Sequence, residues 1–544
     1  MLSTDFRATI SYNRELGKTG DHILSLFGGG ELNSTDRQYT WFRGWGYQYN
    51  NGGEPYLDYH LFKQSQEENS MYYSNSFTYY RNLAFFGMAT YSYKGRYTIN
   101  GTIRYEGTNK LGKSRKARWL PTWNVSGAWN AHEERWWQPT FGKAWTYASL
   151  KGSYSLTADR GPAGVTNSLA VFSSFTPFRP STTASETGIT LYDLENSELT
   201  YEKKHELNIG VALGFVDNRI NVEFDWYRRN NFDLIGYVQT MGVGGQTTKL
   251  ANDASMKSTG CEFTISTVNI KTKDFKWTTD WIFGWAQNEI TKLDSRSQVY
   301  QLVNGYGRMQ GRPVGALYSI PFAGLTEEGL PTFFIDADHT NVVGPGNYAD
   351  IDFQEYENVD YLKYEGSIDP TITGSFGNTF SWKGLKLNVF FTYSFGNVLR
   401  LDDLCPVYSS DYSDLTASMK EMKNRWMVPG DENITTIPAI PTVRQMREIN
   451  ALTNAYSSYN YSTERVAKGD FIRLKELSLA YDLPKKVFEG QKAVSSFGVK
   501  FSATNLWLAY ADKKLNGRDP EYYNTGGVSS PNPRQFTLTV KLGF

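Results

Sequence analysis

The sequence predicts an all-β protein, a transmembrane antiparallel β-barrel of about fifteen strands with long extracellular loops and short periplasmic turns. Three observations predict this class. Long stretches alternate apolar and polar side chains, the connections between them alternate in length, and aromatic residues make up 15% of the chain. A strand that crosses a bilayer needs about 9–11 residues, more than the usual strand of a soluble sheet. Aromatic rings gather at membrane–water interfaces and form the girdles of such barrels.

The composition of the 544 residues agrees with this class. The mean hydropathy is −0.50 and no run of 18 apolar residues occurs, so no transmembrane helix is predicted. In a barrel only alternate strand residues meet lipid, which keeps the average polar. Lys plus Arg equal Asp plus Glu at 56 each, so no net charge would attract nucleic acid. Composition alone also allows a large soluble β-protein with sugar-binding aromatic residues.

The cysteine count and the first residues of the chain indicate less about the class of the protein. Cys261 and Cys405 are too few for a disulfide framework. The first residues lack the basic and apolar regions of an export signal. A barrel of the outer membrane needs such a signal, so either it lies upstream in a longer chain or the barrel prediction is wrong.

Strict alternation is clearest at the end of the chain. Phe536, Leu538, Val540, Leu542 and Phe544 share one parity, with small or polar residues between them. Because bacterial outer-membrane barrels often end on an aromatic strand, Phe544 is the predicted signal for the barrel-assembly machinery. Alternation alone also fits a soluble sandwich, so strand length and loop asymmetry must decide between the two.

The alternating stretches define fifteen predicted strands. They span residues 6–16, 21–32, 77–94, 95–107, 121–132, 145–157, 200–214, 218–232, 257–269, 275–288, 368–382, 383–395, 470–482, 494–506 and 534–544.

The connections between the predicted strands alternate between short and long. Tight turns occur at 18–20, 94–95, 216–218, 271–274 and 383–384, and long segments span 33–76, 158–199, 289–367, 396–469 and 507–533. Outer-membrane barrels place short turns in the periplasm and long loops outside, and a soluble sandwich has no reason for this asymmetry. Such barrels also have an even number of strands with both ends in the periplasm. An odd count therefore predicts a piece that begins at the extracellular rim of a longer protein.

Several stretches carry a resemblance to a known family. The most specific is Gly469–Pro484, GDFIRLKELSLAYDLP, which resembles a late-barrel strand of the SusC/RagA family of TonB-linked outer-membrane transporters of Bacteroidota. Further stretches resemble motifs of that family in the same order: Asn218-Arg219 with Trp226-Tyr227, Met256–Glu262, Gly311–Gly315, Gly366–Pro370 with Gly374–Asn378, Ala503–Leu506, and Asp519–Glu521. The resemblance covers essentially the whole chain.

The resemblance implies that residues 1–544 are the C-terminal part of a barrel of about 22 strands, without the signal, the plug domain and the first strands. It implies import of glycan fragments or oligopeptides across the outer membrane, with energy from the TonB complex acting through the missing N-terminal part. The implied partners are a SusD-like surface lipoprotein, the barrel-assembly machinery, and an oligosaccharide or peptide ligand. A passive porin-like pore and a soluble carbohydrate-binding β-protein remain as alternatives.

No pattern in the sequence predicts an enzyme, a metal or a cofactor. The carboxylate pairs, such as Glu133-Glu134 and Asp402-Asp403, fit loop or rim charges, and the five histidines show no metal-binding spacing. Asp350, Asp352 and Glu355 stand where the family often carries an acidic loop, but the turn glycine of a calcium loop is absent.

Aromatic residues of the first long loop are the predicted ligand-binding residues: Trp41, Phe42, Trp45, Tyr47 and Tyr49. Flat rings stack on sugar faces or on apolar peptide side chains. Packing within the loop, or contact with a partner that covers it, is the alternative.

Two cations of the GDFIRLKELSLAYDLP stretch form a second candidate surface. Arg473 and Lys475 share the parity of Leu477, Leu479 and Tyr481, which would place them at the outer end of a strand near the phosphates of lipopolysaccharide. A β-bulge that reverses the parity is the alternative.

Overall fold

The computed structural model describes most of the chain. The described residues are all of 1–544 except 18–19, 44–46, 56–57, 61–62, 65–67, 69–72, 112–117, 143, 160, 162–169, 176–187, 197, 243–244, 405–419, 485–486, 488–493, 524–530 and 532. The chain divides into two compact units. The first holds Met1–Asn130, Lys151–Asn208 and Arg229–Ser255, and the second holds Ala131–Leu150, Ile209–Arg228 and Met256–Phe544.

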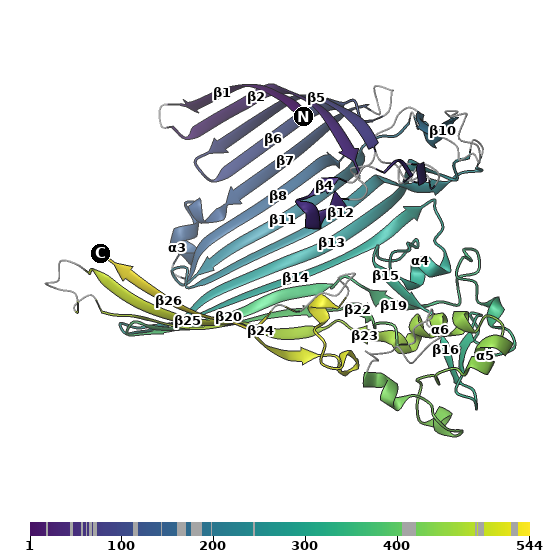
Figure 1. The fold of residues 1–544 in the computed structure, drawn as a ribbon. Helices are drawn as coiled ribbons and strands as arrows, with labels where there is room; N and C mark the ends of the chain where they lie inside the picture. Colours follow the sequence, from purple (N-terminus) through teal and green to yellow (C-terminus); the bar gives the residue numbers. More distant parts are fainter. Residues whose placement is uncertain are drawn as a thin grey trace. The chain divides into compact units, whose positions relative to one another are not determined.

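Fifteen strands form the main sheet, hydrogen-bonded in chain order with the shorter strands left out (Figure 1). They are β1 (Leu2–Leu16), β2 (His22–Phe42), β5 (Tyr73–Tyr93), β6 (Tyr97–Thr108), β7 (Trp119–Asn130), β8 (Trp145–Asp159), β11 (Glu202–Phe215), β12 (Ile220–Gln239), β13 (Thr248–Lys271), β14 (Phe275–Leu293), β20 (Ile372–Trp382), β21 (Leu385–Phe395), β24 (Phe471–Asp482), β25 (Ser496–Ala511) and β26 (Gln535–Gly543).

Each of the fifteen predicted strands is present, but several are longer than the sequence predicted. β2 continues ten residues past the predicted end at residue 32 and pairs with β5 along its whole length, from His22 opposite Tyr93 to Phe42 opposite Tyr73. The predicted loop 33–76 therefore begins too early. Apolar alternation is needed only where a strand faces lipid, so a strand that continues beyond the lipid carries no such signal.

In the first unit the two faces of the sheet differ sharply. Ile99, Ile103 and Val125 lie on one face of β6 and β7, and each exposes more than half of its side chain. On the opposite face polar groups bond across strands, as where Asn100 Nδ2 donates to Thr90 Oγ1 at 2.6 Å. Rows of exposed apolar side chains on one face are what a strand presents to hydrocarbon.

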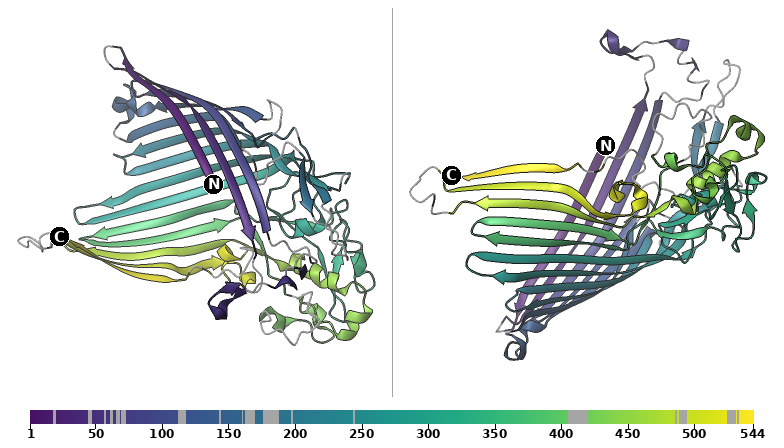
Figure 2. Two further views of the ribbon diagram at one scale, coloured as in Figure 1. Left: turned by 45° about the horizontal axis from the view of Figure 1, so that its top comes forward. Right: turned by 90° about the horizontal axis from the view of Figure 1, so that it is seen from below.

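The second unit repeats this division in β20, β21, β24, β25 and β26, which run side by side (Figure 2). Phe536, Leu538, Val540 and Leu542 of β26 are all more than half exposed on one face. The hairpin between β20 and β21 turns at Lys383 (φ 46°) and Gly384 (φ 90°), the left-handed pair that suits a two-residue turn.

The long connections of the second unit fold into a compact body with its own core, which we call the cap: Val299–Ser367 together with Lys420–Ser462. Its elements are α4 (Val299–Val303), β15 (Ala316–Ser319), β16 (Phe322–Leu325), β17 (Pro331–Phe334), β18 (Val342–Val343), β19 (Lys363–Ser367), α5 (Val443–Glu448) and α6 (Leu452–Asn460). Figure 1 shows these elements gathered at the end of the strands away from the C-terminus. The segments 289–367 and 396–469, predicted as long loops, are therefore largely folded.

The core of the cap joins residues far apart in the sequence. Tyr348, Phe333 and Tyr459 are almost fully buried and belong to one cluster, with Leu302 and Ile351 beside them. The Tyr348 hydroxyl donates to the Pro331 carbonyl at 2.7 Å, which satisfies the one polar group of that side chain. The cap thus buries an apolar core of its own.

The remaining elements are short. They include β3 (Tyr47–Gln48) with β4 (Glu54–Pro55), β9 (Val171–Phe175) with β10 (Gly188–Asp193), the helix α3 (Trp137–Phe141), and β22 (Val398–Arg400) with β23 (Val466–Lys468). No helix within the described ranges has both the length and the apolar character to span a membrane.

Candidate functional site

A polar hollow of about 510 Å³ lies on the polar face of β20, β21, β24, β25 and β26. Its lining is rich in ammonium, carboxylate, amide and hydroxyl groups and comprises Thr379, Lys386, Asn388, Glu476, Ser478, Ala480, Asp482, Gly498, Val499, Lys500 and Lys541. The small residues Ala480 and Gly498 create the space, because long side chains on the neighbouring strands stand around them. Such a surface binds water and polar solutes.

The charges of the hollow are spread over adjacent strands. Lys386 and Lys500 both lie opposite Ala480, one strand to each side, so their backbones are about 10 Å apart. Lys500 pairs with Glu476, with Nζ and Oε1 at 3.3 Å. With Lys541 and Asp482 the lining of the hollow holds three cations and two carboxylates, which can pair with charged groups of either sign.

The cap is joined to β22 by one buried guanidinium. Arg400 Nη1 donates to the Ser462 carbonyl at 2.9 Å, and Nη2 donates to the carbonyls of Val303 at 3.2 Å and Tyr318 at 2.5 Å. Burial lowers the pKa of Arg400 to about 10, against the attraction of Glu365. Because these carbonyls come from both halves of the cap, Arg400 fixes β22 to both.

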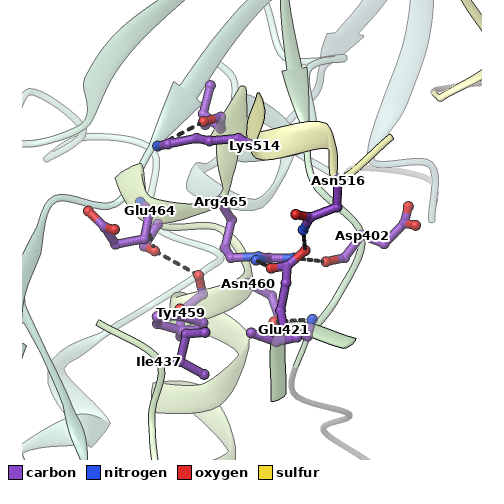
Figure 3. Close-up of polar contacts among 12 residues, drawn as sticks. Asp402, Glu421, Ile437, Tyr459, Asn460, Glu464, Arg465, Lys514 and Asn516 are labelled. Atoms are coloured by element: carbon purple, nitrogen blue, oxygen red, sulfur yellow. Dashed lines mark hydrogen bonds and ion pairs between the residues drawn. The ribbon is translucent and has the colours of Figure 1, made fainter. Parts of the chain in front are cut away.

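A second buried arginine joins the cap to the connection after β25. Arg465 is 3% exposed, and its Nη1 contacts Glu421 Oε2 at 2.6 Å while Nη2 donates to the Asp402 carbonyl at 2.6 Å. Asn516 Nδ2 donates to the other oxygen of Glu421 at 2.8 Å (Figure 3). The three side chains come from segments that the sequence placed in two different loops.

The environment of Arg473 differs from the one that the sequence predicts. Against β21, Glu476 lies opposite Phe390 and Leu474 lies opposite Phe391, so Lys475 is the extra residue of a β-bulge. Arg473 is 5% exposed, forms an ion pair with Asp519, and lies with Nε 3.3 Å from Glu521 Oε2. The proposed contact of Arg473 with lipopolysaccharide phosphates is therefore wrong, and the bulge is confirmed. Lipopolysaccharide contact through Lys475 stays a prediction.

The carboxylate of Glu355 in the cap accepts backbone hydrogen bonds within a turn. Glu355 accepts the backbone N–H groups of Tyr356 and Glu357 at 2.7 and 2.6 Å, and these bonds with that of Asn358 hold the pKa of the carboxyl below its ordinary value. Among the residues that the structure describes, no group of three or more His, Cys, Asp or Glu side chains could hold a metal ion. These carboxylates act as turn-forming acceptors.

The predicted ligand-binding aromatic residues lie in different elements. Trp41 and Phe42 belong to the end of β2 rather than to a loop, and Tyr49 stands in a short 3₁₀ turn after β3. Phe42 and Tyr49 are 77% and 84% exposed. The Arg43 guanidinium lies 5.0 Å from the centre of the Trp41 ring.

Three other predicted positions add less. Tyr47 is in β3, with its backbone opposite Pro55, and Trp45 lies outside the described residues. Phe544 follows β26 and is 88% exposed. Ligand binding by the aromatic residues, and recognition of Phe544 in barrel assembly, stay predictions.

The sequence does not predict the side chains that fix the cap, the β22–β23 pair and the sheet to one another. The stretches that contain Arg473 and Asp519 both resemble family motifs, but nothing in their spacing indicates that the two residues pair. Arg465, Glu421 and Asn516 carried no signal, because a buried ion pair between distant segments leaves no periodic pattern.

The sequence is similar to several TonB-dependent receptors. It is 26% identical over 488 residues to the TonB-dependent receptor P3 of Formosa agariphila, a match that covers 84% of this chain and 45% of that protein. It is 25% identical to the TonB-dependent receptor P26 of the same organism, covering 98% of this chain and 52% of that protein. The TonB-dependent receptor SusC of Bacteroides thetaiotaomicron matches 39% of this chain at 27% identity and 21% of its own length. No protein-family model matches the sequence.

Solved structures show the same fold. The RagAB peptide transporter superposes on 100% of this chain with a TM-score of 0.74 at 22% identity, over 55% of its own length. The closed-closed state of the RagAB peptide importer gives 0.75 at 23% identity, also over 55% of its length. The chain thus spans about half the length of the proteins it matches. With the two-faced strands, these findings show an antiparallel β-barrel fold of the bacterial outer membrane.

Proposed function

We propose that this chain, a homologue of the SusC-like TonB-dependent receptors, is the barrel part of an importer that carries glycan fragments or oligopeptides across the outer membrane. One observation carries the proposal: β20, β21, β24, β25 and β26 present exposed apolar side chains on one face, as at Phe376, Leu479 and Leu538, and a charged, hollowed wall on the other. The first face suits hydrocarbon and the second suits a water-filled path. Similarity to the RagAB peptide transporter favours peptides as cargo, and the exposed rings Phe42 and Tyr49 favour sugars.

The proposed partners follow from the same arrangement. The cap would form the extracellular contact surface for a SusD-like surface lipoprotein, because it is a folded body at the end of the strands that carries the long connections. TonB would supply energy through parts of the whole protein that lie outside these residues. The barrel-assembly machinery would insert the strands, with Phe544 as the signal that it reads.

The test uses cells that produce the whole protein. Uptake of labelled oligosaccharide and oligopeptide pools is measured with TonB present and with TonB deleted, and the amount of protein at the surface is checked in each strain. We expect one pool to enter only when both TonB and this protein are present. Uptake that persists without TonB would contradict the proposal and support a passive pore.

The wall itself can be tested separately. Lys386→Glu with Lys500→Glu reverses two of the three positive charges of the hollow, and Lys383→Glu reverses a cation in the neighbouring turn as a control. A cargo that follows this wall should enter at a changed rate in the double variant and at the normal rate in the control. Equal uptake rates in the native protein, the double variant and the control would show that the cargo does not pass along the hollow.

A further inference from the structure

The chain enters one half of the cap through β22 and leaves it through β23, a two-stranded stem that continues from β21 and β24. Two residues on each side join the stem to the sheet, Gly396-Asn397 and Gly469-Asp470. Gly396 has φ +86°, a conformation that L side chains rarely adopt, and Gly469 has no room for a Cβ beside the Asn397 side chain. The two connections lie opposite each other, with the Gly469 N–H donating to the Asn397 carbonyl at 2.9 Å and the Gly396 N–H donating to Asp470 Oδ1 at 2.7 Å, and we call them the hinge.

The segment Asp512–Tyr523, directly after β25, lies against this stem, and we call it the latch. Asp512 Oδ2 accepts the backbone N–H of Lys468 at 2.8 Å, and its Oδ1 accepts that of Lys514 at 2.9 Å. Lys514 Nζ in turn donates to the Val466 carbonyl at 3.3 Å. One end of the latch is thus bonded to the backbone of β23.

An apolar contact fixes the middle of the latch. Leu515 is 1% exposed and packs in a small core with Leu399, Leu401 and Ala467, all from the stem or the residue after it. This core is separate from the core of the cap. The latch therefore supplies the side chain that closes the apolar side of the stem.

Polar and charged groups fix both faces of the latch. Asn516 donates to Glu421, the partner of Arg465 (Figure 3). Arg518 forms an ion pair with Asp402. On the sheet side, Asp519 and Glu521 hold Arg473 of β24. The latch thus contacts the stem and the sheet at once, across the hinge.

We infer that the latch sets the angle of the stem at its glycine hinge and so locks the cap onto the sheet. Arg400 ties the stem to both halves of the cap, so the stem and the cap move together. Releasing the latch frees the stem to turn without unfolding the cap, which keeps its own core. This inference does not depend on the identity of the cargo.

Hydrogen exchange of the whole protein, measured by mass spectrometry in outer-membrane vesicles, tests the lock. Leu515→Ala should speed exchange of the amides that pair β22 with β23 at least tenfold, while amides of the cap core such as Leu302 keep their rates. Asp512→Asn, which keeps one of two acceptors, should have a smaller effect. Lys513→Ala changes an exposed neighbour and should leave all rates as they are.

Two outcomes would overturn the inference. One is unchanged exchange in β22 and β23 of Leu515→Ala. The other is equal acceleration across the cap core, which would show that the latch merely stabilises the cap. If Leu515→Ala fails to reach the membrane, Asp512→Asn and Asn516→Ala give the same reading on a milder scale. Uptake by each variant is measured in parallel. Exchange that changes as expected in a protein that imports nothing would support the latch and contradict the proposed function, and normal uptake with unchanged exchange would do the opposite.

Discussion

The strands of the second unit and the cap that they carry are stabilised in different ways. In β26 the large apolar side chains are more than half exposed, and the strand has no core of its own. In the cap, Phe333, Tyr348 and Ile351 are almost fully buried against one another. The strands thus depend on a lipid solvent and on a continuous backbone ladder, whereas the cap has the interior of a water-soluble domain. Each region should therefore respond to a different kind of change.

Loss of the cap core should have the largest effect. Phe333 is fully buried and packs edge-on against Phe322, with ring centres 6.1 Å apart. Phe333→Ala should destabilise the cap by about 3–5 kcal/mol, because a buried ring is replaced by a cavity. Limited proteolysis of the protein in vesicles should show cleavage within the cap and intact strands β20–β26. Ile434→Ala, at a site 84% exposed in the cap, is the control and should change little. Simultaneous loss of strands and cap would show that the two regions are one cooperative unit.

Removing the buried arginine of β24 should be nearly as costly. Arg473→Ala leaves Asp519 without its guanidinium, and breaking such a buried pair costs about 3–5 kcal/mol. Arg444, which pairs with Glu448 on the exposed face of α5, is the matched control, because exposed pairs are worth about 0–1 kcal/mol. Urea unfolding of the whole protein, followed by tryptophan fluorescence, measures both. Similar effects of the two variants would show that Arg473 is solvated in the membrane-bound protein.

The same difference between the strands and the cap determines which parts of the fold the sequence predicts. Alternation of apolar and polar residues is a local pattern, so the sequence predicts all fifteen strands from their own residues. The β-bulge at Lys475 is one of the two alternatives that the sequence allows. The cap was not found, because Tyr348 and Tyr459 come from segments about a hundred residues apart and follow no period. The partners of Arg473 and Arg465 were missed for the same reason. The end of β2 was placed too early because its last ten residues lack the apolar alternation that lipid demands.

A charge on the lipid face of a strand should disturb the sheet but not the cap. Leu538 lies mid-strand on the apolar face of β26, and its neighbour Thr537 lies on the polar face. Leu538→Arg should cost about 2–4 kcal/mol of sheet stability, the cost of an arginine near the bilayer midplane. Thr537→Arg should cost far less. Heat-dependent mobility on gels, which reports the folded barrel, compares the two, and equal effects would contradict the assignment of faces.

High pH should weaken the cap before it affects the strands. Burial raises the pKa of Tyr318 and of Tyr361 to about 12, and nearby Asp352 adds to the shift at Tyr361. A tyrosine in an unfolded chain ionises near pH 10, so the stability from these hydroxyls is complete below about pH 10 and is lost as the pH rises towards 12. Tyrosinate absorbance against pH should show a late-titrating group that is smaller in Tyr318→Phe and Tyr361→Phe. Complete titration near pH 10 with the cap still folded would contradict the buried environment.

The smallest expected effect comes from one hydroxyl in the cap core. Tyr348 is fully buried, and its hydroxyl donates to the Pro331 carbonyl at 2.7 Å. Tyr348→Phe keeps the ring and removes this bond, which should cost about 1 kcal/mol, far less than Phe333→Ala. Burial also raises the pKa of Tyr348, so the variant should become less sensitive than the native protein to pH above about 10. Urea unfolding of the cap at neutral and alkaline pH measures both effects. A loss of stability as large as that of Phe333→Ala would mean that polar contacts stabilise the cap as much as its apolar core does. The cap would then differ from the strands in more than the burial of apolar side chains.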